Sequence, residues 1–156
     1  MTWESICADK SLQDLPYKIE TNRYSQIIMS PASGKHGILQ GRITRYLGRT
    51  MPEGEVISEC PIQTDEGVKV ADVAWASDKY IEEFADRITF PEAPELCVEV
   101  ISPSNSEAEM SQKRKLYFSQ GAKEVWLCTL KGQVTFYTSS GEVATSTLFP
   151  AFPKEI

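Results

Sequence analysis

The fold of this chain is decided by the stretch Pro94-Glu95-Leu96-Cys97-Val98-Glu99-Val100-Ile101-Ser102-Pro103-Ser104. From Leu96 to Ile101 every residue but one is apolar, and prolines stand on both sides, which is typical of a short strand buried on both faces. The exception is Glu99. Glutamate is uncommon in strands, and an unpaired carboxylate in apolar surroundings is costly. We therefore expect Glu99 to be protonated, paired with a cationic group, or bound to a cation.

A second lone carboxylate occurs in a second strand that reads as buried. The strand Glu55–Thr64 runs into Asp65-Glu66-Gly67, which is a hairpin turn signal, and Val68–Trp75 follows it. From Val70 onward this segment is apolar apart from Asp72. Two carboxylates on neighbouring strands repel each other, so a divalent cation is the simplest partner for both.

Composition sets the broad class. The 156 residues suffice for one domain with a real core, covering residues 1–156. The net charge of −6 argues against coating nucleic acid by bulk positive charge, but a local metal-carboxylate site remains compatible with it. We find no apolar span long enough for a membrane helix and no signal peptide, so we expect a cytoplasmic protein without a membrane partner.

Cysteine and histidine usage excludes two kinds of site. The four cysteines are far apart, and Cys97 and Cys128 fall in apolar runs, where they are expected as core residues. His36 is the only histidine, which argues against a Cys/His zinc site. A Ser-His-Asp triad is disfavoured because no GxSxG motif is present.

The N-terminal third predicts a short helix, a hairpin and a long helix. Met1–Leu15 is expected as a packing arm. Tyr17–Met29 alternates around Asn22-Arg23 and predicts a hairpin with Glu20 in its first arm. Lys35–Arg49 predicts a helix that Ser33 can cap.

Three groups of side chains divide the surface of that helix at about 100° per residue. Its apolar face carries Leu39, Ile43, Tyr46 and Leu47, and His36 and Gln40 lie on or beside it near the helix start. A satisfied buried histidine explains His36 as well as a functional role does. Arg42, Arg45 and Arg49 share another face, for which a solvated surface is the plain alternative to substrate binding.

The second substantial helix follows the Glu99 strand. Ser106 and Glu109 have the spacing of a capping box, and Gly121 ends the helix. Lys113 projects into the middle of the apolar arc, whereas Lys115 points nearly opposite. The plain alternative is that the stem of Lys113 carries its ammonium out to solvent. The strand Glu124–Leu130, a turn at Lys131-Gly132 and the strand Gln133–Thr138 come next, and Ser139–Gly141 turns the chain again into Val143–Phe149.

This order of elements resembles the PD-(D/E)xK nuclease superfamily, and more closely the Uma-two family, a large bacterial group of restriction-endonuclease-like proteins. The resemblance spans nearly the whole chain. It rests on Met1–Glu4, Met29–Ser33 followed by His36, Val70–Ala74, Glu99–Ser104, Lys113-Arg114 with Leu116-Tyr117, and Gly121–Trp126. It implies an α+β fold: a restriction-endonuclease-like mixed sheet flanked by helices, with an N-terminal hairpin.

The resemblance also implies a chemistry, that of a magnesium-dependent endodeoxyribonuclease. Asp72 and Glu99 would bind Mg²⁺ or Mn²⁺, joined by the backbone carbonyl of Val100 or Ile101. Ile101 stands where the E-x-K lysine belongs, and Lys113 matches the migrated lysine of this family. Ala71 replaces the proline that usually precedes the aspartate, a mild change of backbone.

The resemblance also implies accessory residues. Glu20, His36 and Gln40 are candidates, and either Glu20 or Gln40 would supply the additional ligand or orienting group. Arg42, Arg45 and Arg114 are candidates for holding flanking DNA backbone. A homodimer would suit an enzyme that cuts both strands.

Two alternatives to an active nuclease stand beside this hypothesis. The first is a catalytically inactive binding or regulatory protein on the same fold, since fold does not determine function. The second is structural: Glu99 and Lys113 would form a buried ion pair that fixes the register of strand and helix.

Overall fold

The stretch around Glu99 forms the central strand β5 (Leu96–Val100), and all five of its residues are buried. The computed structural model describes residues 1–156. β5 pairs antiparallel with β4 (Gly67–Ala76) and parallel with β6 (Glu124–Cys128). The sheet has six strands in the order β3-β4-β5-β6-β7-β8, with β3 at Glu55–Thr64, β7 at Val134–Thr138 and β8 at Gly141–Val143. The predicted mixed sheet is therefore confirmed.

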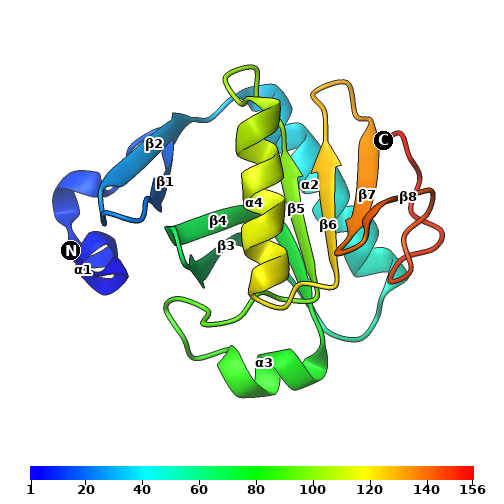
Figure 1. The fold of residues 1–156 in the computed structure, drawn as a ribbon, viewed down its shortest axis with the longest axis horizontal. Coiled ribbons are helices and arrows are strands. Elements are labelled where there is room, and N and C mark those ends of the chain that lie inside the picture. The colour runs from blue at the N-terminus through cyan, green and yellow to red at the C-terminus, as the bar shows by residue number, and fades with distance from the viewer.

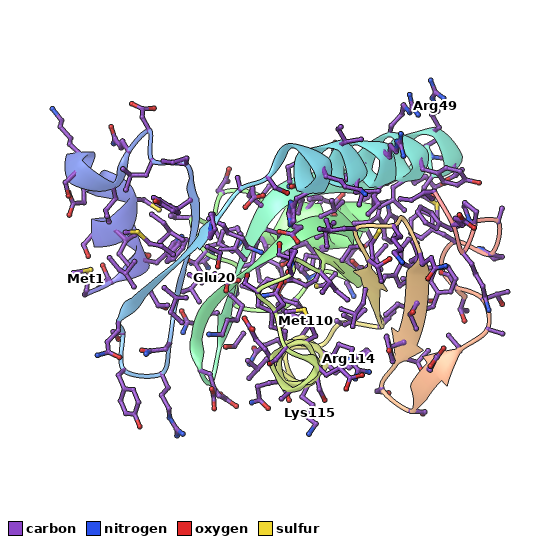
Figure 2. The ribbon with its side chains drawn as sticks, turned by 90° about the horizontal axis from the view of Figure 1, so that it is seen from above. Met1, Glu20, Arg49, Met110, Arg114 and Lys115 are labelled. Carbon is purple, nitrogen blue, oxygen red and sulfur yellow. The ribbon has the colours of Figure 1, made fainter.

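One helix covers each face of the sheet. α2 (Gly34–Thr50) covers one face, and α4 (Glu107–Ser119) covers the other and connects the parallel strands β5 and β6 (Figures 1 and 2). The apolar side of α2 packs Leu39, Ile43 and Leu47 into a core that includes Trp126 and Phe136. A second core contains Cys97, Tyr117 and Val125, together with residues of α3 (Asp78–Phe84). Burial of Cys97 and Cys128 agrees with their prediction as core residues.

The N-terminal hairpin is a separate two-stranded sheet at one side of the molecule (Figure 1). Its strands are β1 (Tyr17–Thr21) and β2 (Ile27–Pro31), as predicted. It docks on β4 through Thr21 and Glu20: Val68 N–H donates to Thr21 Oγ1, and Val70 N–H donates to a Glu20 carboxylate oxygen, each at 2.8 Å. No hairpin residue belongs to either apolar core.

The predicted helix boundaries are close to those observed. Ser33 caps α2, and Ser106 with Glu109 forms a capping box on α4. Gly121 follows α4 with a φ of +100°, a conformation that glycine adopts without strain. The N-terminal arm is α1 (Trp3–Ala8) followed by a single 3₁₀ turn at Lys10–Leu12.

The segment after β8 is organised by a buried carboxylate, that of Glu124. Its oxygens accept hydrogen bonds from Ser146 Oγ and from the backbone N–H groups of Thr147 and Leu148, at 2.6 to 2.9 Å. Trp126 Nε1 donates a fourth. These bonds satisfy the backbone of a turn that follows the end of β8 at Val143, and beyond this turn the tail buries Phe149 and Phe152 in the core.

None of the helices combines the length and the apolar character that crossing a membrane requires.

Candidate active site

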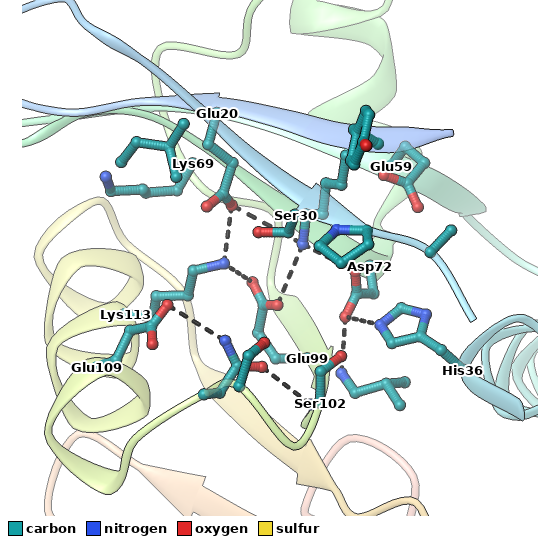
Figure 3. A pocket seen from close by; sticks show the side chains of 18 of the residues that line it. Glu20, Ser30, His36, Glu59, Lys69, Asp72, Glu99, Ser102, Glu109 and Lys113 are labelled. Atoms are coloured by element: carbon teal, nitrogen blue, oxygen red, sulfur yellow. Dashed lines mark hydrogen bonds and ion pairs between the residues drawn. The ribbon is translucent and has the colours of Figure 1, made fainter. Parts of the chain in front are cut away.

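Asp72 and Glu99 meet where strands β4 and β5 stop pairing. The last paired residues are Val73 and Val98, so the next residue on each strand stands opposite the other. Both side chains are buried, at 1% and 2% exposure. The predicted proximity of the two lone carboxylates is thus what the structure has (Figure 3).

The ammonium of Lys18 lies between them. Lys18 Nζ is 2.8 Å from Asp72 Oδ1 and 3.3 Å from Glu99 Oε2. Sequence reasoning missed this residue. A signal was present, because Lys18 precedes Glu20 by two positions in a predicted strand, and residues two apart point to the same face.

Lys113, on α4, contacts the carboxylate of Glu99 as well. Its Nζ lies 3.2 Å from Glu99 Oε1 and 2.8 Å from Glu20 Oε1, so the inward direction predicted from the helical wheel is observed. Tyr117, one turn later on α4, donates its hydroxyl to Glu99 Oε1 at 2.5 Å. Glu99 is consequently held by two ammonium groups and a phenol.

Asp72 is positioned by α2 and by the end of β5. Its Oδ2 accepts the Val100 N–H at 2.7 Å and lies 3.2 Å from His36 Nε2. Gln40 Nε2 donates to the backbone carbonyl of Asp72 at 2.7 Å and to Glu59 Oε1 at 2.8 Å. Glu59 interrupts the β3–β4 pairing with a φ of +53°, which leaves that carbonyl for Gln40. Gln40 therefore contacts the backbone of the cluster, whereas Glu20 contributes a carboxylate to it.

The two central carboxyls differ in proton affinity. Burial raises the pKa of Glu99 above its ordinary value, against the lowering effect of Lys113 and Lys18. Burial would also raise the pKa of Asp72, but hydrogen bonds from His36 and Lys18 lower it well below the usual range. Of the two, Asp72 is therefore the firmer anion at neutral pH.

The cationic and accessory groups respond to the same charges. Burial alone would lower the pKa of Lys18, yet the charges of Glu99, Asp72 and Glu20 raise it well above its usual value. The pKa of His36 is raised above 6.5 by its hydrogen bond to Asp72. Lys18 consequently stays charged at neutral pH, and the cluster is an alternation of acids and bases.

The cluster forms the floor of a cavity of about 600 Å³ between the hairpin, the start of α2 and the start of α4. Glu20, His36, Gln40 and Val100 all line it. The predicted substrate-binding arginines do not. Arg42 and Arg45 are exposed and line a separate hollow with Arg49 and the C-terminal tail, on the outer side of α2. Arg114 lies in a third cavity on the other side of α4.

The carboxylates of the cluster are the type of ligand that magnesium prefers, but they are not arranged around an empty metal position. No group of three or more His, Cys, Asp or Glu side chains is disposed to hold a metal ion. However, Asp72 Oδ1 and Glu99 Oε2 converge on one point, which the Lys18 ammonium holds. Magnesium commonly takes one or two protein carboxylates and completes its shell with water and substrate phosphate. The two carboxylates fit that requirement if the ammonium moves aside.

The fold is shared with a solved structure. The chain is similar to the crystal structure of "a putative nuclease belonging to DUF820" from Anabaena variabilis ATCC 29413, with a TM-score of 0.66 and 20% sequence identity. The match covers 77% of this chain and 71% of the other. The likeness shows the fold, a mixed sheet between two helices, that this chain shares with that structure.

The family follows from the sequence match. Residues 11–152 match the Uma2 family, described as "Putative restriction endonuclease". This chain belongs to that family. No curated protein matches it.

Proposed function

We propose that this protein is a metal-dependent nuclease that hydrolyses phosphodiester bonds of DNA. The observation that carries the proposal is the convergence of Asp72 Oδ1 and Glu99 Oε2 on one cationic point, in a cavity at the end of the central strands. Family membership supports a nucleic-acid substrate, because the family is described as "Putative restriction endonuclease".

Asp72 and Glu99 would hold Mg²⁺ or Mn²⁺, and the carbonyl of Val100 is a candidate third oxygen. When bound, the ion would polarise the scissile phosphate and lower the pKa of a water molecule. Lys113, fixed by Glu20 and Glu99, would stabilise negative charge that builds on the phosphate oxygens. His36 and Gln40 would act as positioning residues, because they orient the carboxylate and the backbone of Asp72.

The test begins with the ion and ends with the substrate. Isothermal titration with MgCl₂ and MnCl₂ should show binding to the wild type, and Asp72→Asn should abolish it. Supercoiled plasmid, linear duplex and single-stranded DNA are then incubated with wild type, Asp72→Asn and Lys113→Met. We expect Lys113→Met to retain metal and lose cleavage. A wild type that binds neither ion and nicks no DNA contradicts the proposal.

A catalytically inactive binding or regulatory protein is the second candidate. The observation in its favour is that the Lys18 ammonium already pairs with both Asp72 and Glu99, at the point where a metal ion would have to bind. Under this alternative, the wild type binds DNA in EDTA and does not cleave it, whichever metal ion is added.

The purely structural alternative makes a different prediction. If the pair of Glu99 and Lys113 serves only to fix the register of β5 and α4, Glu99→Gln and Lys113→Met should be harmful singly and tolerated together. Magnesium should then leave the melting temperature unchanged. A homodimer remains a proposal, and sedimentation equilibrium would measure it.

A further inference from the structure

Arg114 lines the cavity on the other side of α4 from the carboxylate cluster, and its guanidinium has no acceptor in the protein. Its guanidinium carbon is 3.8 Å from the ring centre of Tyr137, so the two groups are stacked. Its Nε is buried and makes no hydrogen bond. Buried donors in proteins are nearly always paired, yet Arg114 takes part in none of the salt bridges of the structure. Stacking on Tyr137 therefore fixes the Arg114 side chain, and its donors are free to bind an acceptor from a ligand.

The cavity of about 530 Å³ beside Arg114 carries the groups that an oxyanion needs. The hydroxyl-bearing residues Ser111, Thr129 and Thr135 line it together with Arg114, and Glu107 is the one acidic residue in the lining. The planar fork of a guanidinium matches two oxygens of a phosphate, and hydroxyls donate to the remaining ones.

This cavity lies on the same face of the sheet as the carboxylate cluster. Glu99 is paired with Leu127 across β5 and β6, and Leu127 is paired with Thr135 across β6 and β7. Paired residues point to one face, and neighbouring strands are about 4.8 Å apart, so Thr135 stands roughly 10 Å from Glu99. Asn105, in the loop before α4, lines both cavities.

We propose that Arg114 and Tyr137 form a phosphate subsite that holds the DNA backbone to one side of the scissile bond. This inference rests on the proposed nuclease function for its ligand. It singles out Arg114 among the three arginines suggested by the sequence, because Arg42 and Arg45 are exposed on the outer side of α2. Tyr137 acts by holding the guanidinium flat over its ring.

The experiment measures DNA affinity separately from cleavage. Fluorescence anisotropy of a labelled 20-base-pair duplex is recorded with wild type, Arg114→Gln, Arg114→Lys and Tyr137→Leu, in EDTA and in calcium, over a range of NaCl concentrations. The matched control is Lys115→Gln, which removes the same charge from the next, exposed position of α4.

We expect Arg114→Gln to weaken binding about five- to tenfold and to reduce the salt slope by about one, with Lys115→Gln changing affinity less than twofold. Arg114→Lys should be intermediate, because it keeps the charge and loses the fork. Tyr137→Leu should weaken binding while leaving the charge in place. Equal effects of Arg114→Gln and Lys115→Gln overturn the subsite, as does a wild type that binds no DNA.

The two proposals fail in different ways. Magnesium titration of Arg114→Gln should match the wild type, because Arg114 touches neither carboxylate. If the protein binds no metal and cleaves nothing, yet Arg114→Gln selectively loses DNA, the subsite stands and the hydrolytic function falls. If plasmid is cleaved and Arg114→Gln behaves like Lys115→Gln, only the subsite falls.

Discussion

Replacing Lys18 by methionine should tighten metal binding. Methionine has nearly the same length and apolar volume as the lysine stem, so Lys18→Met removes the ammonium with little change in packing. In the wild type, an incoming Mg²⁺ has to break the contacts of Lys18 Nζ with Asp72 Oδ1 at 2.8 Å and Glu99 Oε2 at 3.3 Å. A hydrogen bond to a charged group contributes about 1.5–3 kcal/mol.

The magnitude follows from what the displaced ammonium regains. Lys18 is already 16% exposed, so its ammonium recovers hydration when it leaves, and the net cost stays near one such bond rather than two. Removing that cost should raise the association constant roughly ten- to a hundredfold, at 1.4 kcal/mol for each factor of ten. The metal-free variant should also melt at a lower temperature, because two buried carboxylates lose a counter-charge.

Isothermal titration with MgCl₂ gives the affinity, and thermal melting in EDTA and in magnesium gives the stability. The matched control is Lys35→Met, which removes an exposed lysine next to His36 on α2 without contact to either carboxylate. An affinity for Lys18→Met that equals or falls below that of Lys35→Met refutes the reasoning. It would mean that the ammonium supports the metal site instead of competing for it.

Three further predictions concern the surroundings of the site and the fold. The NMR titration of His36, the only histidine, should give a pKa above 6.5 that returns toward 6.5 in Asp72→Asn. Because the folded state raises this pKa, protonated His36 stabilises the fold below about pH 6.5, and this contribution is lost as the pH rises through the raised pKa. An unchanged His36 titration in Asp72→Asn contradicts the contact. Glu124→Gln should lower the free energy of unfolding in urea by about 2 kcal/mol or more, because an amide nitrogen would face donors, while the exposed Glu142→Gln should change it by less than about 0.5 kcal/mol. Gly67→Ala should loosen the hairpin and speed its proteolysis, because φ is +88° and the added Cβ would lie 2.5 Å from the Asn22 carbonyl; an unaltered cleavage rate would show that the hairpin is docked by other contacts.

The apolar patterning of the sequence carries enough information to predict the sheet and the two carboxylates. Buried strands show as unbroken apolar runs, and a single charge inside such a run, as at Asp72 and Glu99, is conspicuous. Lys113 could be predicted for the related reason that one polar residue interrupts the buried arc of α4. In each case, the residue stands out against its own segment.

Lys18 and the role of Glu124 could not be found in this way. Lys18 lies in an alternating strand, where a lysine is ordinary, and only the docking of the hairpin on β4 brings it to the carboxylates. Glu124 begins a strand, where a charged residue attracts no attention, and three of its four hydrogen-bond donors lie more than twenty residues later. Both depend on contacts between distant segments, which local patterns do not encode.

The hairpin brings one base and one acid, Lys18 and Glu20, to a cluster whose remaining members belong to the main sheet and its two covering helices. Because neither apolar core includes a hairpin residue, changes in β1 and β2 alter the ionic composition of the cavity without disturbing the apolar packing of the sheet and its helices. The hairpin can therefore vary in sequence, whereas the main sheet and its two covering helices must be kept. For engineering, this suggests exchanging the hairpin as a cassette, so that the balance of charges above Asp72 and Glu99 is retuned on an unaltered scaffold.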